Sequence, residues 1–403
     1  MNNINQPALR NLPGIIFTGL VTSFMIASCS KSGTTHTTPP VGPPPGAITN
    51  TIIPGGNIKG IMLSDSTYTI NGDVTVLAAD TLTILPGATI KVAMGKSFHV
   101  HGIINSLGSR AKPILFTSSA SPQQVADWGG FQCDDAKAVT FRWTKIYYTG
   151  SPDATGLGLR TIHIVASIPF IFEDCWVRYA SEDALRLEGG PQISVQRNTF
   201  DFIGASDAEA INVKTGTTGI IAYNVVWSTA GSAIKSETLT PLVPTTHVKI
   251  YNNTCVDIGY RRGYSEPGRG TLLDKFGGGD IFNNLYVNAY IGLDIAPDAD
   301  TLHTTYGNNY FYSTLDSVRQ YFYPAGSVGM TQTTDIISSG AANNDPMFVK
   351  YTTPPNINLL INPNDFHLKP GSPAIGKGNA TYNNDIGAYT TSTDTLKSNQ
   401  HTD

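Results

Sequence analysis

The sequence predicts an all-β protein that folds as a parallel β-helix, a solenoid in which each coil of the chain stacks on the next. Three observations lead to this fold. One short pattern recurs between residues 171 and 311. It consists of an apolar residue, a carboxamide or carboxylate three positions later, and a mostly large apolar residue two positions after that. The repeats start about 24–31 residues apart, which suits coils with loops of unequal length. The 40 Gly, 25 Pro and 14% charged residues favour strands and tight turns over long surface helices.

The polar position of the repeat is mostly asparagine. Asparagine tolerates the left-handed bend that is needed where one strand turns into the next, and stacked amides can hydrogen-bond to one another. A strand of alternating polarity cannot bury its apolar side alone, so each coil has to stack on its neighbours. We therefore expect the polar side chains of successive coils to lie one above another. The three columns are Ile171, Val195, Ile221, Ile250, Ile281 and Tyr306; Asp174, Asn198, Asn224, Asn253, Asn284 and Asn309; and Trp176, Phe200, Val226, Cys255, Tyr286 and Phe311.

Several short motifs resemble the right-handed parallel β-helix proteins of the pectin-lyase-like superfamily, in their bacterial surface lipoprotein form. Within the repeat, the resemblance is carried by Asn-Thr-Phe at 198–200 and Asn-Asn-Thr at 252–254. Runs at 82–90, 101–103, 112–118 and 127–130 resemble the opening coils of such proteins, and runs at 344–348, 365–368, 370–375 and 385–389 resemble their closing segment. The resemblance implies a single right-handed β-helix over residues 50–389 that ends in a closing C-terminal segment.

The first residues have the pattern of an export signal. Residues 1–28 combine Arg10 with an apolar run that is too short and too interrupted to span a membrane comfortably. The end of this run, Ile-Ala-Ser-Cys at 26–29, resembles the bacterial lipobox, in which the cysteine is lipidated; an ordinary signal peptide is the alternative. We expect a lipid anchor at Cys29, a Pro/Thr-rich tether over 29–49 and a disordered tail over 390–403. These features predict a protein of the Gram-negative cell envelope, at the outer membrane surface or in the periplasm.

Composition and cysteine placement exclude several classes of protein. A formal net charge of −4 argues against a general nucleic-acid binder. The eight His are scattered, and the nearest pair, His99 and His101, has no further Cys or His at ligand spacing, so we expect no zinc site. Besides Cys29 the chain has Cys133, Cys175 and Cys255; the last two should face opposite ways, so no disulfide joins them. Calcium is the one metal with any candidate ligands, and only Asp207 with Glu209 suggests a site. We expect a monomer.

A second strand follows each polar position and is expected to carry the binding surface. Its inward residues are Leu185, Ile211, Ile234, Leu272 and Leu293. Its outward residues form two columns: Arg186, Asn212, Lys235, Leu273 and Asp294; and Glu188, Lys214, Glu237, Lys275 and Ala296. The second column alternates in charge over four coils, and stacking about 4.8 Å apart would make it a ladder of opposite charges. Such a ladder either stabilises the register or offers a polar platform to sugar hydroxyls and carboxylates.

The longest interval between asparagine steps holds an arginine-rich insertion at residues 260–269. Arginine pairs with carboxylates in two parallel hydrogen bonds, which makes a uronic-acid polymer a suitable ligand. Internal ion pairs that hold the loop together are the alternative explanation. The residues expected to bind substrate are Arg186, Glu209, Arg261, Arg262, Glu266 and Arg269.

Two reactions fit such a ligand. Eliminative cleavage needs a cation on the uronate carboxylate and a base at the neighbouring carbon, whereas hydrolysis needs two carboxylates across the bond. The cations would come from Lys214, Lys235, Arg261 or Arg262, and the carboxylates from Asp183, Asp207, Glu209 or Asp274; Lys214, Lys235 and Asp274 are the catalytic candidates. The motifs of polygalacturonases are absent. The expected function is binding of an acidic polysaccharide. If the protein is an enzyme, it is expected to cleave this polysaccharide as a lyase or glycoside hydrolase. The alternative is a non-catalytic surface protein that presents loops for adhesion or partner binding.

Overall fold

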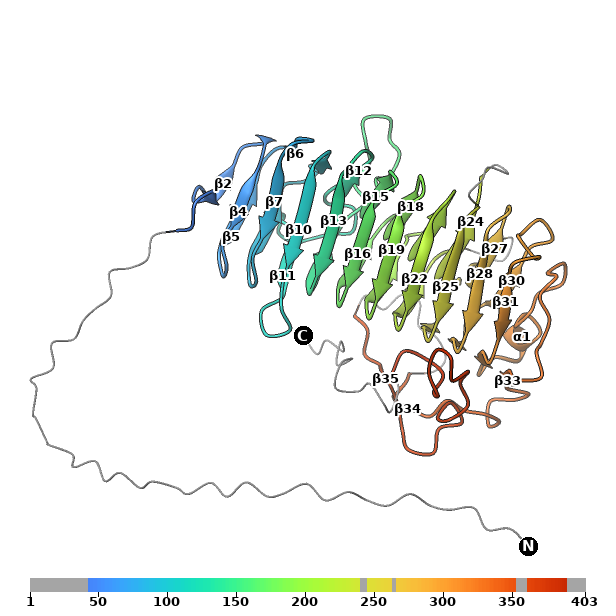
Figure 1. Ribbon diagram of the computed structural model, residues 1–403. Coiled ribbons are helices and arrows are strands. Elements are labelled where there is room, and N and C mark those ends of the chain that lie inside the picture. Colours follow the sequence, from blue (N-terminus) through green and yellow to red (C-terminus); the bar gives the residue numbers. More distant parts are fainter. Residues whose placement is uncertain (1–42, 240–244, 263–265, 353–360, 390–403) are drawn as a thin grey trace, which may run out of the picture. The chain divides into compact units, whose positions relative to one another are not determined.

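The computed structural model describes residues 43–239, 245–262, 266–352 and 361–389, and the folded unit begins at Pro44 (Figure 1). The expected signal peptide, the expected lipidation site at Cys29, the expected tether up to residue 42 and the tail from residue 390 lie outside these residues. None of the helices in the part described is long and apolar enough to cross a membrane.

Three long parallel sheets, A, B and C, run along the solenoid, and each coil up to β30 contributes one strand to each of them (Figure 1). Sheet A contains β1 (Ala47–Ile48), β4 (Gly60–Met62), β7 (Thr81–Ile84), β10 (Ile103–Leu107), β13 (Ala138–Arg142), β16 (Pro169–Glu173), β19 (Gln192–Gln196), β22 (Thr218–Ala222), β25 (His247–Tyr251), β28 (Gly278–Phe282) and β31 (Thr305–Gly307). Sheet B contains β2 (Ile52–Ile53), β5 (Thr67–Ile70), β8 (Thr89–Val92), β11 (Ile114–Ser118), β14 (Thr144–Tyr147), β17 (Trp176–Ala180), β20 (Thr199–Ile203), β23 (Val225–Thr229), β26 (Thr254–Val256), β29 (Leu285–Val287), β32 (Tyr310–Tyr312) and β33 (Ile336–Ile337). Sheet C contains β3 (Gly56–Asn57), β6 (Val74–Val76), β9 (Phe98–Val100), β12 (Phe131–Cys133), β15 (Ile162–Val165), β18 (Leu185–Glu188), β21 (Ile211–Lys214), β24 (Ile234–Glu237), β27 (Arg269–Asp274) and β30 (Ile291–Ile295).

The predicted right-handed parallel β-helix is confirmed, and its core is built from in-register apolar rows. One such row of sheet C joins neighbouring coils through parallel pairing, and every member is fully buried or nearly so. Burial of a large aliphatic or aromatic side chain contributes about 1.5–3 kcal/mol, so each added coil extends the core. The row consists of Val74, Phe98, Phe131, Ile162, Leu185, Ile211 and Ile234.

The predicted stack of asparagines is also confirmed, at the turn from sheet A to sheet B. The side-chain amide of Asn198 donates to the amide oxygen of Asn224 (2.9 Å), and Asn224 donates in the same way to Asn253 (2.9 Å). Asn253 continues the chain to Asn284 (2.9 Å) and Asn284 to Asn309 (3.1 Å). Each oxygen also accepts the backbone N–H of the preceding ladder residue, so both polar ends of these buried amides are satisfied.

The left-handed bend beside this ladder falls one residue earlier than the sequence predicted. The backbone φ is +58° at Arg197, +59° at Tyr223 and +52° at Asn252, each the residue before a ladder asparagine. The expectation that the ladder residues themselves make the bend was wrong. Asparagine occupies the ladder because its amide can both donate to and accept from its neighbours.

The first coil of the repeat is also shifted by one residue from the predicted register. Phe172, not Ile171, pairs with Val195, so Cys175 takes the ladder position that was expected for Asp174. The Cys175 backbone N–H donates to the Asn198 amide oxygen at 2.8 Å and begins the ladder. Adjacent apolar residues at 170–172 made either register acceptable in sequence. Cys133, Cys175 and Cys255 are buried free thiols, in agreement with the expected absence of a disulfide between the last two.

The closing segment follows the one short helix described, α1 (Asp316–Arg319), and covers the outer face of sheet B (Figure 1). Its antiparallel strands β34 (Phe348–Lys350) and β35 (Asp365–Leu368) form a separate small sheet. A second apolar cluster lies between this segment and the later coils, and it contains Val225, Trp227, Val256, Leu285, Val287, Tyr310, Tyr312, Phe348, Phe366, Ala374, Ile386, Ala388 and Tyr389. Sheet B is thus covered on both sides over these coils, whereas the outer face of sheet C carries no such layer in the part of the chain described.

Candidate functional site

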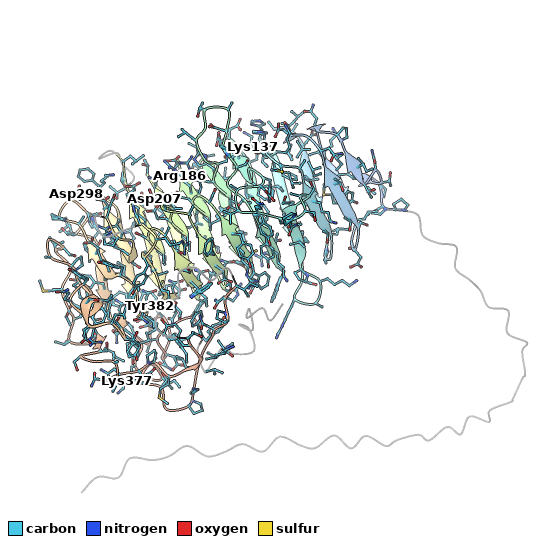
Figure 2. The ribbon with its side chains drawn as sticks, turned by 180° about the vertical axis from the view of Figure 1, so that it is seen from behind. Lys137, Arg186, Asp207, Asp298, Lys377 and Tyr382 are labelled. Atoms are coloured by element: carbon cyan, nitrogen blue, oxygen red, sulfur yellow. The ribbon has the colours of Figure 1, made fainter. Side chains whose placement is uncertain are left out.

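The outer face of sheet C carries a row of polar side chains, which we call the polar face. In Figure 2, Lys137, Arg186, Asp207 and Asp298 lie along this side of the solenoid, away from the closing segment. Parallel pairing places one outward residue of each coil beside the next, about 4.8 Å apart. The polar face consists of His163, Arg186, Asn212, Lys235, Leu272 and Asp294.

One coil of the polar face departs from the predicted register. Lys235 pairs with Leu272, and Glu237 pairs with Asp274, so Leu272 faces outward and Leu273 is buried in the core. The predicted assignment of these two leucines was therefore wrong. The charge ladder beside the face consequently reads Glu188, Lys214, Glu237, Asp274, and the strict alternation of sign ends at the fourth coil.

A cluster of lysines surrounds Glu237 at the end of strand β24. Lys214 forms a short ion pair with one Glu237 oxygen, while Lys235 Nζ (3.1 Å) and Lys275 Nζ (3.4 Å) contact the other. Although burial by itself raises the pKa of Glu237, these cations lower it to about 2. Lys235 also lies 4.0 Å from Asp274, and although burial lowers the pKa of Lys235, Glu237 and Glu209 raise it overall. Lys214 and Lys235 thus suit the predicted cationic role, but a protonated lysine cannot act as the base of an elimination.

A buried pair of carboxyl groups lies at the opposite edge of the polar face, before the start of strands β18 and β21. Asp183 Oδ1 accepts the backbone N–H of Glu209 at 2.8 Å. The Asn212 amide nitrogen bridges the pair, since it donates to Asp183 Oδ2 (3.0 Å) and to Glu209 Oε2 (3.3 Å). Burial, followed by the charge and hydrogen bond of Asp183, raises the pKa of Glu209 to about 8. Ionisation of both carboxyl groups at the same time is therefore unfavourable.

The arginine-rich insertion divides between the polar face and the body of the solenoid. Arg262 lies beside the face, with contacts to Asp207 (3.1 Å), Glu266 (3.1 Å) and Glu209 (3.7 Å). Arg269 pairs with Asp294 at 3.1 Å and donates to the Pro267 carbonyl. The internal ion pairs weighed as the alternative are thus present.

Arg261 turns away from the polar face. Its guanidinium donates to the carbonyls of Ile203, Gly204 and Ser228 at 2.7–3.1 Å and lies over the Phe202 ring, 4.1 Å from the ring centroid. Burial lowers the pKa of Arg261 to about 10. Arg261 therefore anchors the loop to the solenoid and does not face the surface where a ligand was expected.

Two polar atoms on adjacent strands of the polar face lack a hydrogen-bond partner. They are Arg186 Nε, a donor, and Asn212 Oδ1, an acceptor. Asn212 is only 3% exposed, and its amide nitrogen donates to both carboxyl groups, which leaves the amide oxygen without a partner. Arg186 Nε has only a loose ionic contact, 3.5 Å from Glu188. A ligand with an acceptor for Arg186 Nε and a donor for Asn212 Oδ1 would satisfy both atoms.

No metal centre accompanies the site in the described ranges, where three or more His, Cys, Asp or Glu side chains are nowhere grouped as metal ligands. Asp207 and Glu209, which had suggested calcium, face the guanidinium of Arg262 instead. His163 was not predicted as a residue of the polar face. It contacts Glu188 at 2.9 Å and Asp134 at 3.4 Å. The alternation of apolar and polar residues at 162–165 could have identified His163 as an outward residue of sheet C. It lies before the first repeat of the pattern at 171–311, so it was not used.

Comparison with known proteins supports the fold and leaves the site open. Residues 56–140 match the family model of the pectate-lyase like beta helix domain. The crystal structure of pectate lyase Pel9A is similar at 15% identity and a TM-score of 0.40, over 78% of this chain and 88% of that chain. No curated protein matches the sequence. The family match and the three parallel sheets confirm the expected resemblance to right-handed β-helix proteins, but the matched residues end before Asp183, so they assign no role to the polar face.

Proposed function

We propose that the protein binds a polysaccharide along the polar face of sheet C. The observation that supports this most directly is the pair of unsatisfied atoms, Arg186 Nε and Asn212 Oδ1, on neighbouring strands. A buried polar atom without a partner costs about 1–3 kcal/mol, and a sugar ring carries hydroxyl donors and acceptors at the spacing that would recover this energy. A solenoid repeats the same spacing from coil to coil, which suits a ligand that is itself a repeating chain.

The finer form of the proposal is a polymer that contains uronic acid. Arg186, Lys235 and Arg262 supply cations on one side of the solenoid, although each also contacts a carboxylate. A uronate would replace part of these internal contacts, and it would gain charge-assisted hydrogen bonds to arginine.

The test is retention of the full-length protein in gels that contain polygalacturonate, alginate or a neutral galactan. Retention by any of them supports polysaccharide binding, and stronger retention by the two acidic polymers supports the finer form. Asn212→Ala with Arg186→Ala should abolish retention, whereas Lys369→Ala, in the closing segment, should leave it unchanged. No retention in any gel contradicts the proposal. Release of reducing ends, or absorbance near 235 nm from new double bonds, would extend it from binding to cleavage.

We further propose that Cys29 is lipidated and holds the protein at the envelope of a Gram-negative bacterium. The support is the Ile-Ala-Ser-Cys motif at the end of an apolar run, followed by a polar, proline-rich stretch. Cells grown with radiolabelled palmitate should label the protein, and Cys29→Ser should remove both the label and its recovery with membranes. An unlabelled protein would indicate an ordinary signal peptide.

A further inference from the structure

The carboxyl pair Asp183–Glu209 lies where a ligand on the polar face would reach it. Asn212 donates to both carboxyl groups through its nitrogen, and its oxygen has no hydrogen-bond partner within the protein. Glu209 is 7% exposed and Asp183 is 5% exposed, so the pair forms the edge of the polar face and is not a solvated cluster.

The groups around Glu209 leave its negative charge poorly compensated. Asp183 and Asp207 face it as like charges, and both disfavour its ionisation. Lys235 favours ionisation, but it is already bound to Glu237. Arg262 is 3.7 Å away and lies closer to two other carboxylates. Two carboxyl groups that share one neutral donor cannot both ionise cheaply, so one of them keeps its proton.

We propose that the Asp183–Glu209 pair is a proton-dependent subsite, in which the proton shared by the two carboxyl groups leaves them with a single negative charge beside a carboxylate of the bound polysaccharide. This inference rests on the proposed binding function and specifies its ligand. It explains how a face whose cations Arg186, Lys235 and Arg262 already contact carboxylates accepts an acidic chain, since the shared proton removes one negative charge. Loss of that proton would place the ligand carboxylate against two ionised groups.

The consequence is that binding of an acidic polymer is coupled to one proton and binding of a neutral polymer is not. The affinity of full-length protein for polygalacturonate should fall about tenfold for each pH unit above about 8, because only the protonated pair binds. The affinity for a neutral galactan should change little between pH 6 and pH 10.

The experiment measures affinity by titration calorimetry from pH 6 to pH 10 for the wild type, Glu209→Gln and Glu188→Gln. The amide introduced by Glu209→Gln still donates a hydrogen bond and cannot ionise, so this variant should bind polygalacturonate with a flat pH profile. Glu188 is a matched control in the charge ladder beside the polar face, and His163 lowers its pKa, so Glu188→Gln should keep the wild-type pH slope. Melting temperatures confirm that each variant is folded.

Each outcome decides between the two proposals. Binding of polygalacturonate that does not depend on pH, or an equal slope in wild type and Glu209→Gln, overturns the subsite and leaves polysaccharide binding intact. Binding of the galactan alone also overturns it. No binding to either polymer at any pH overturns both proposals.

Discussion

Two polar rows run along this solenoid, and they differ in whether their hydrogen bonds are complete. In the asparagine ladder between sheets A and B, Asn224 donates to Asn253 and accepts from Asn198, and both amide ends are used. On the polar face of sheet C, the neighbouring residues Arg186 and Asn212 each keep one atom without a partner. Both rows arise from the same parallel stacking. A row of identical residues completes itself, whereas a row of unlike residues leaves groups for something else to bind.

The largest effect should come from breaking the complete row. Asn224→Ala removes an acceptor of two donors from Asn198 and a donor to Val195 and Asn253, all in the interior. We expect a loss of about 4 kcal/mol in the free energy of unfolding, measured by urea denaturation. Asn212→Ala, the same change in the incomplete row, removes one donor to Asp183 and Glu209 and should cost less, about 2 kcal/mol. Equal losses at the two sites would show that the rows do not differ.

The next effect concerns the charged edge beside the polar face, where stability should depend on pH in two opposite ways. The lysine cluster lowers the pKa of Glu237, so its contribution is present above about pH 4.5 and is lost as the pH falls towards 2. The expected loss is on the order of 2 kcal/mol, and Glu237→Gln should remove this pH dependence. Glu209 has the opposite sign: its pKa is raised, so the folded state becomes less stable as the pH rises from 4.5 towards 8. Urea denaturation between pH 2 and pH 9 tests both, and a Glu209→Gln curve parallel to the wild type would contradict the second.

A smaller effect should separate the two neighbouring arginines of the insertion. Arg261→Ala leaves the carbonyls of Gly204 and Ser228 without donors and should lower the unfolding free energy by about 2 kcal/mol. Arg262→Ala removes partly solvated ion pairs and should cost under about 1 kcal/mol. Thermal unfolding of both variants checks the comparison. A larger loss for Arg262 would mean that its ion pairs, not the anchor at Arg261, hold the loop.

The smallest effect on stability should accompany a clear effect on binding. Arg186→Ala changes one residue of the incomplete row and should shift the unfolding free energy by less than about 1 kcal/mol. Retention in polygalacturonate gels should nevertheless drop by about tenfold, which corresponds to one charge-assisted hydrogen bond. Asn71→Ala, at an exposed amide between β5 and β6, is the control and should alter neither property.

The fold could be predicted because its signal repeats. Five ladder asparagines and the closing motifs were recognisable in the sequence, and the side-chain amides of these asparagines stack and hydrogen-bond to one another as expected. The errors fell where two adjacent residues are both apolar, at Ile171-Phe172 and at Leu272-Leu273. Alternation then fits either register, and only pairing with the neighbouring coil decides which residue faces inward.

The site was harder to predict, since its groups converge from separate coils. Glu209, Arg262 and Asp183 were named individually from their residue types. The pairing of Asp183 with Glu209 depends on burial and on the bridging amide of Asn212, which no sequence spacing reveals. Arg261 and Arg262 are identical in sequence terms. The local backbone turns one towards the Phe202 ring and the other towards Glu209, so composition could not separate an anchor from a ligand-facing group.

The closing segment has a consequence for how the protein is made. The coils can stack in order from the first to the last, yet the outer side of β23, β26, β29 and β32 stays uncovered until residues 344–352 and 361–389 pack against it. Translation that stops early would leave a nearly complete solenoid with Trp227, Leu285 and Tyr310 bare, and such a product should aggregate even though its coils are sound.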